Sequence, residues 1–139
     1  MARPRTFSVV ILGVLAAVAA CQRTATEDCR DEGTTSVLIG PKPDQVNPPC
    51  VKLHPNDTVY FMATDMTKVL TIDFPTNQPF QNMKQLSNGR WAINCKGSTC
   101  SSGPVNSAAT GTFDYNQALA ASESAPPDKA DGRIIIVRP

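Results

Sequence analysis

Five cysteines and one histidine are the side chains of this 139-residue sequence with the greatest capacity for chemistry. Thiols can form disulfides, bind metals, carry lipid or act as nucleophiles, so their number and spacing limit what the protein can do. The cysteines are Cys21, Cys29, Cys50, Cys95 and Cys100. Because five is an odd number, one cysteine has no partner within the chain. Cys21 stands apart because it directly follows an apolar run.

The apolar run at residues 7–20 indicates that the chain starts with a targeting segment. Arg3 and Arg5 place positive charge before it, and the run is too short to span a bilayer comfortably. This is the pattern of a secretory signal peptide, which we assign to residues 1–20. A buried core helix is the alternative, and the extreme N-terminal position and small-residue end disfavour it.

The residues that close the run resemble the lipobox of bacterial lipoproteins. They read Val18-Ala19-Ala20-Cys21, an aliphatic residue and two small residues before a cysteine. The resemblance implies that the Cys21 thiol carries a diacylglycerol and that cleavage leaves Cys21 as the new N-terminus. Gln22 follows, which in such proteins implies sorting to the outer membrane, facing the periplasm. Lipidation at Cys21 accounts for the odd cysteine.

The four remaining cysteines are expected to form two disulfides, because the chain is exported. Their spacing alone leaves all three connectivities open. We expect Cys95 to pair with Cys100 across a glycine-containing turn, and Cys29 to pair with Cys50. A redox pair or half of a metal site is the alternative for Cys95 and Cys100, but redox motifs usually have two residues between the thiols.

Short β-rich runs separated by turn residues dominate the rest of the chain. Residues 21–34 are polar and are expected to tether the lipid to a single domain at residues 35–139. No helical period is sustained, and twelve prolines and eight glycines suit a strand-and-turn protein. The pattern predicts an antiparallel β-sandwich of about seven strands. The expected strands are residues 35–40, 50–55, 58–63, 68–74, 90–95, 111–116 and 132–137.

Three details accompany this prediction. Residues 132–137 contain consecutive apolar side chains, so we expect a central strand that is buried on both faces. Residues 75–90 are expected to be irregular, with one helical turn at residues 79–86. Trp91, at the start of a strand, is expected to pack in the core.

Two stretches resemble the cupredoxin family. Residues 51–74, "VKLHPNDTVYFMATDMTKVLTIDF", resemble the middle of a cupredoxin domain, and residues 111–139 resemble its end, where a strand enters the metal loop and a glycine-led strand closes the sheet. The resemblance covers about half of the chain after residue 20. It implies an all-β, antiparallel Greek-key β-sandwich.

The copper ligands of that family are missing. A type 1 copper site needs two histidines, a cysteine thiolate and usually a methionine. Thr67 and Lys68 stand where the first histidine is expected, Gln117 stands in the region of the thiolate, and residues 118–131 contain neither histidine nor methionine. We therefore expect a cupredoxin-like scaffold with no type 1 copper and no other metal or cofactor.

His54, before Pro55 in a turn, is interpreted as an ordinary exposed histidine. The alternative is a soft Cu(I) site formed by His54 with Met62, Met66 or Met83. No catalytic residues are assigned, because a nucleophile–histidine arrangement is absent and no nucleophile-elbow motif occurs. Carboxylate pairs could be drawn from the aspartates, but acids at strand ends and turns are normally solvated. These aspartates are Asp57, Asp65, Asp73 and Asp114.

The sequence predicts a non-enzymatic, lipid-anchored envelope protein whose sandwich domain has a binding or structural role. The net charge of +1 and the lack of like-charge runs argue against nucleic acid as a partner. The expected partners are the membrane, through the N-terminal lipid, and an envelope protein. The alternatives are a periplasmic copper-handling lipoprotein that uses His54 with methionines, and an enzyme of a type not recognised from its sequence.

Overall fold

A computed structural model describes residues 29–31, 33–42, 44–127 and 131–139. The predictions for the signal peptide, for lipidation at Cys21 and for the tether as far as residue 28 lie outside these residues. Within them, no helix is long and apolar enough to cross a membrane.

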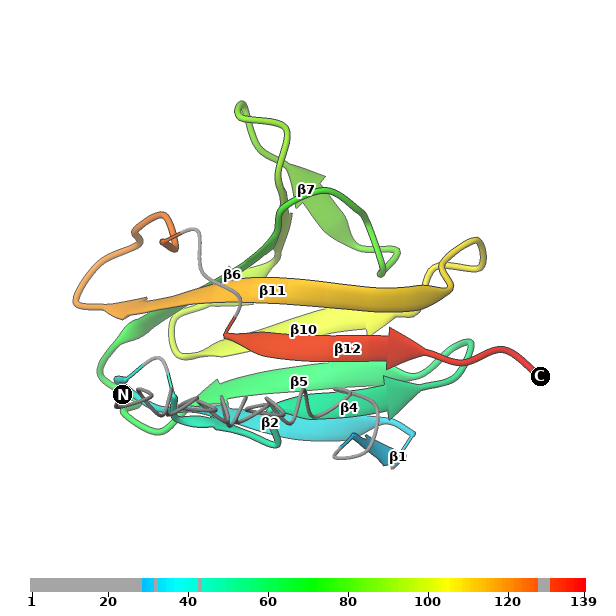
Figure 1. The fold of residues 1–139 in the computed structure, drawn as a ribbon. Coiled ribbons are helices and arrows are strands. Elements are labelled where there is room, and N and C mark those ends of the chain that lie inside the picture. The colour runs from blue at the N-terminus through cyan, green and yellow to red at the C-terminus, as the bar shows by residue number, and fades with distance from the viewer. Residues whose placement is uncertain (1–28, 32, 43, 128–130) are drawn as a thin grey trace, which may run out of the picture.

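In the described residues, twelve strands form two sheets that pack face to face (Figure 1). The larger sheet has the order β1 (Arg30–Asp31), β4 (Cys50–Leu53), β12 (Gly132–Ile136), β11 (Gly111–Ala120), β6 (Val69–Phe74), β8 (Trp91–Ile93) and β7 (Met83–Gln85). The smaller sheet has the order β3 (Val46–Asn47), β2 (Thr35–Ile39), β5 (Thr58–Ala63), β10 (Thr99–Pro104) and β9 (Cys95–Lys96). The predicted all-β sandwich is therefore confirmed.

Strand pairing is mixed, and the described part of the chain contains more strands than the seven expected. β2 pairs with β5 in parallel, and so do β4 with β12 and β1 with β4, while the other ladders are antiparallel. The parallel pairs arise because the chain crosses from one sheet to the other between β2 and β4 and again between β4 and β5. Strands that are neighbours in a sheet then need not be neighbours in sequence.

The core lies between the sheets and follows the two-residue period of the strands. In β5, Val59, Phe61 and Ala63 are buried, whereas Tyr60 between them is exposed. Phe61 and Phe74 both make ring contacts with Tyr115, at centroid distances of 5.2 and 5.7 Å. The two sheets thus share one aromatic centre, to which strands from both contribute.

The last strand differs from its prediction. β12 is central, between β4 and β11, but only one of its faces is fully buried. Ile134 and Ile136 point into the core, whereas Arg133 and Ile135 are half-buried on the outer face. The smaller sheet covers the inner face of β12, but no helix or third sheet among the described residues covers its outer face.

Several elements were not predicted from the sequence, or were predicted with a different extent or structure. β11 continues to Ala120, four residues beyond the predicted end, because its second half pairs with β6. The expected helical turn at residues 79–86 is wrong: Phe80 forms a bridge with Val105, and β7 pairs with β8. β1 and Cys29 lie within the segment expected to be a tether. Figure 1 shows β7 projecting from the sandwich at the end of the sheet that is farthest from β1.

Candidate functional site

The positions that the cupredoxin resemblance assigns to copper ligands do not form a metal site. Gln117 lies opposite Ile72 in β6 and is buried, with 7% of its surface exposed. Thr67 is exposed and precedes β6, whose first residue lies opposite Ala120. The start of β6 therefore lies three residues farther along β11 than Gln117, a distance of about 10 Å. The donors present, an amide and a hydroxyl, do not match the nitrogen and sulfur ligands of type 1 copper.

His54 does not share a site with the methionines at the other end of β5. Its ring Nε2 lies 2.9 Å from Asp31 Oδ1, and its backbone N–H donates to Asp57 Oδ2 at 2.7 Å. Met66 follows the far end of β5, and a strand of six residues spans roughly 20 Å. Met66 is 62% exposed and accepts a hydrogen bond from the Ser98 hydroxyl at 3.4 Å. The structure thus separates His54 from Met66.

The other two methionines lie on different sheets. Met62 is half-buried in β5, beside Leu38 and Thr99, and Met83 packs against the core from β7. The described part of the chain contains no group of three or more histidine, cysteine, aspartate or glutamate side chains that could bind a metal ion.

The two disulfides expected from the sequence are present. Cys29 is bonded to Cys50, with Cα atoms 4.6 Å apart, and Cys95 to Cys100, with Cα atoms 4.0 Å apart. The second bond joins two directly opposed residues of the β9–β10 hairpin. All four thiols are consumed by these bonds, so none of them supplies a thiolate nucleophile or metal ligand.

The four aspartates considered for chemistry each have a partner of their own. Asp57 accepts from the His54 amide, Asp65 from the Thr67 amide and hydroxyl, and Asp114 from Arg133 at 2.6 Å. The hydrogen bonds from Thr67 lower the pKa of the Asp65 carboxyl. Each of these contacts joins a carboxylate to a donor, and none of them joins two carboxylates.

Asp73 is buried, so the expectation that all four acids are solvated is wrong for this residue. Its carboxylate is 2% exposed and receives two bonds from the Arg90 guanidinium, at 2.8 Å from Nε and 2.6 Å from Nη2. Asn116 adds a bond at 3.4 Å. β6 is an interior strand of the sheet, and Arg90, just before β8, covers the carboxylate from the outer face. The arrangement is a paired internal charge that links three neighbouring strands.

A second internal polar group lies where β11 leaves β12. The backbone N–H of Gln117 donates to Asp131 Oδ2 at 3.3 Å. Gln117 Oε1 and Asp131 Oδ1 are buried and have no hydrogen-bond partner among the residues that the structure describes. Burial, and next the charge of Asp131, raise the pKa of the Tyr115 phenol. Gly132 lies against the Tyr115 ring so closely that a Cβ there would overlap it.

A cleft with a volume of about 830 Å³ lies at the β7 end of the larger sheet. Its floor is the first half of β6, its walls are β7 and the segment from β8 to the β9–β10 hairpin, and residues 123–126 after β11 close one side. The cleft exists because β8 pairs with β6 only at Asp73 and Phe74 and then crosses to the smaller sheet as β9.

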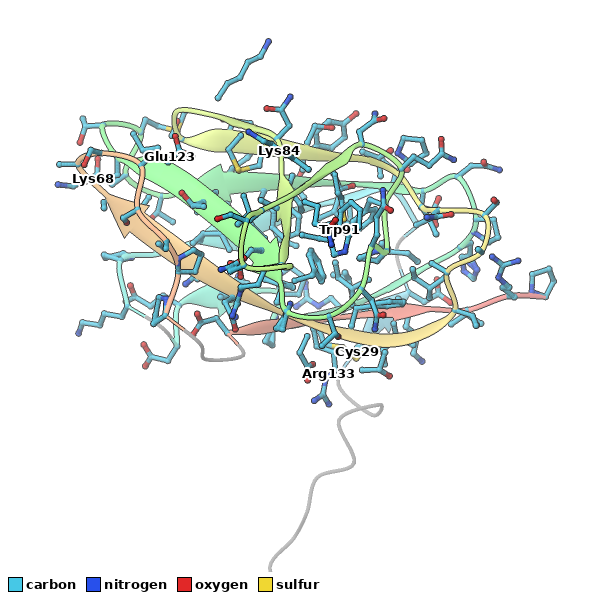
Figure 2. The ribbon with its side chains drawn as sticks, turned by 90° about the horizontal axis from the view of Figure 1, so that it is seen from above. Cys29, Lys68, Lys84, Trp91, Glu123 and Arg133 are labelled. Carbon is cyan, nitrogen blue, oxygen red and sulfur yellow. A yellow bond between two sulfur atoms is a disulfide. The ribbon has the colours of Figure 1, made fainter. Side chains whose placement is uncertain are left out.

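The lining of the cleft combines apolar and polar groups. Met83, Ile93 and the Cys95 side of the disulfide are apolar, and Asn94 is exposed among them. Lys84 and Glu123 bring opposite charges; Figure 2 shows both on the side of the molecule away from Cys29. Such a surface suits a ligand with apolar contacts and amide hydrogen bonds rather than a strongly charged one.

Sequence analysis did not find this cleft. Its residues come from β6, β7, β8, the hairpin and a loop, and the segment with β7 was expected to be irregular. Trp91, expected in the core, is half-buried near the same end of the sheet, because only β7 lies beyond β8. The one available signal was the "CKGSTC" hairpin, whose Cys95 and Gly97 line the cleft.

Comparisons with known proteins add little beyond the fold. No protein-family model and no curated protein matches the chain. Among solved structures, an oxidized lysine-for-methionine mutant of amicyanin is 14% identical with a TM-score of 0.45, covering 75% of this chain and 82% of that one. A reduced Cu(I) form of a glycine-for-proline mutant of amicyanin at pH 4 is 14% identical with a TM-score of 0.46, covering 76% and 84%.

These similarities say nothing about copper in this chain. Its own strand pairing shows a β-sandwich of two packed sheets with long-range parallel pairs. Fold and cleft together define a β-sandwich with a surface cleft at one sheet edge.

Proposed function

We propose that this protein is a lipid-anchored binding module of the bacterial envelope, attached through Cys21 and without catalytic activity. The anchor is inferred from the lipobox-like residues that end at Cys21. The two disulfides are consistent with an oxidising, extracytoplasmic compartment. Outer-membrane attachment, facing the periplasm, follows from Gln22 in the same resemblance.

The observation that carries the binding role is the cleft beside β7. β7 is the last strand of its sheet in the described structure, so one edge of Met83–Gln85 has no neighbouring strand. Apolar side chains and the exposed amide of Asn94 are next to that edge. An extended segment of an envelope protein can pair with a free strand edge and place side chains in such a cleft. We infer that the ligand is a protein segment of this kind.

Site-specific photo-crosslinking in cells tests the binding role. A crosslinking residue at Asn94 should give a discrete adduct with one envelope protein. The same residue at Ser101, exposed on the outer face of the smaller sheet, is the matched control and should not. Equal adducts at both sites, or none at Asn94 in otherwise intact cells, would contradict the proposal.

Lipidation is tested separately with Cys21→Ser. Metabolic labelling with a fatty acid should mark the parent protein and not the variant, and the variant should leave the membrane fraction or remain uncleaved. Membrane partitioning that is unchanged in this variant rules out Cys21 as the anchor.

A further inference from the structure

The chain joins the sandwich at one edge of the larger sheet and the cleft lies at the other. Cys29 is bonded to Cys50 at the start of β4, and β1 then forms the outermost strand beside β4. β7, which lines the cleft, is the outermost strand at the opposite edge. Figure 1 shows β1 and β7 at opposite sides of the molecule, and Figure 2 shows Cys29 on the side away from Lys84 and Glu123.

The segment between the anchor and Cys29 is short compared with the sheet. Eight residue steps separate Cys21 from Cys29 (29 − 21 = 8). Fully extended they span at most about 29 Å, and a flexible chain of that length has a root-mean-square span of roughly 16 Å. Six strand spacings between β1 and β7 amount to about 29 Å. The β7 edge could therefore face the membrane only if this segment were fully stretched around the domain.

The Cys29–Cys50 bond keeps this segment short. β1 has only two residues, so hydrogen bonds alone would hold it weakly. If β1 detached, the free segment would continue to the start of β2 at Thr35 and gain six residue steps (35 − 29 = 6). The disulfide prevents this lengthening because it fixes Cys29 covalently to the sheet.

We propose that the β1 edge of the larger sheet, made by β1, β4 and β12, faces the lipid surface, so that the cleft opens away from the membrane. This inference rests on the proposed lipid anchor at Cys21. The edge carries the basic side chains Arg30, Lys52 and Arg133, but Lys52 lies opposite Asp31 and Arg133 is paired with Asp114. The orientation therefore rests on the short segment before Cys29, and the partner surface is the phosphate-bearing headgroup layer. The cleft is then presented to proteins in the periplasm.

Quenching of tryptophan fluorescence by brominated lipid tests the orientation. The full lipidated protein is reconstituted into phosphatidylcholine–phosphatidylglycerol vesicles that contain brominated acyl chains. Trp91→Phe first removes the native tryptophan. Lys52→Trp then reports from β4 and Lys84→Trp from β7, both at side chains that reach the surface. Arg30→Trp is a second reporter for the anchored edge if Lys52→Trp does not fold.

We expect the reporter at the anchored edge to be quenched roughly twofold or more above the β7 reporter, because the two edges differ in depth by most of the sheet width. Adding Cys29→Ser and Cys50→Ser should reduce that difference. Equal or stronger quenching at Lys84→Trp, in protein shown by mass spectrometry to carry lipid, overturns the orientation and leaves the anchor intact. Protein without lipid at Cys21 overturns the proposed function instead. A difference unchanged by loss of the disulfide overturns the role given to that bond.

Discussion

Nε2 of His54 lies 2.9 Å from Oδ1 of Asp31, so the only histidine of the chain links the turn after β4 to β1. Both side chains are about half exposed, at 44% and 53%. The contact lies at the β1 edge of the larger sheet, away from the cleft. It gives His54 a structural neighbour and places its ring at the opposite end of β5 from Met66.

We expect no blue copper band when the oxidised protein is titrated with Cu(II) and followed by visible spectroscopy. The intense absorption of type 1 sites requires a cysteine thiolate held beside histidine ligands. Here the four described cysteines are in disulfides and one imidazole is available. An intense band that disappears in His54→Ala would show that a copper site had been missed; Met66→Ala is the matched variant at the other end of β5.

Arg90→Ala should destabilise the protein by about 3–5 kcal/mol, because it leaves the buried Asp73 carboxylate without its main partner. Arg133→Ala is the matched control, since its Asp114 pair is much more exposed and should contribute about 1 kcal/mol or less. Urea denaturation measures both free energies of unfolding. Equal losses for the two variants would mean that the burial of Asp73 does not govern the cost.

Replacing Cys29 and Cys50 together by serine should cost more stability than replacing Cys95 and Cys100. Their sequence separations are 21 and 5 residues. In the chain-entropy description these separations correspond to about 3 and 2 kcal/mol. Thermal or urea unfolding of the two double variants compares them directly. The reverse order would show that local contacts of the β9–β10 hairpin outweigh the loop-closure effect.

Tyr115 should make the protein less stable at alkaline pH. Burial raises the pKa of this phenol above that of an unfolded chain. Below pH about 10 both states keep the proton, and above it only the unfolded state loses the proton, so the free energy of unfolding falls by up to about 1.4 kcal/mol per pH unit. Tyr115→Phe should flatten this decline relative to the parent protein, whereas Tyr60→Phe, at an exposed site, should not.

The elements that sequence analysis found are those with their own local signal. β5 alternates Val59, Phe61 and Ala63 inward, and its predicted bounds are those of the structure. β10 has no such signal, because serine, glycine and proline make up most of it. It forms through distant contacts: β5 and β9 pair with it on either side, and the buried Ser102 hydroxyl accepts a bond from the Val59 amide at 2.9 Å.

The cleft was beyond sequence analysis for the same physical reason. It depends on where β8 stops pairing with β6, which is decided by the path of the chain between two sheets. By contrast, the lack of copper ligands could be inferred from residue types alone, because one histidine cannot supply two. The residue types in the sequence limit which ligands and nucleophiles are available, whereas the pairing of distant strands determines the shape of the cleft.

The bond between Cys29 and Cys50 also has a mechanical meaning. A pull on the N-terminal segment reaches the sandwich through a covalent link and bypasses the two-residue β1 ladder. The load then enters the start of β4, which runs parallel to β12 over four residue pairs. Separating two such strands by a force along their axis requires their hydrogen bonds to break together in shear, and not one after another as in unzipping. A pull directed along β4 at Cys29 would therefore load these four residue pairs together, and β1 would carry none of it.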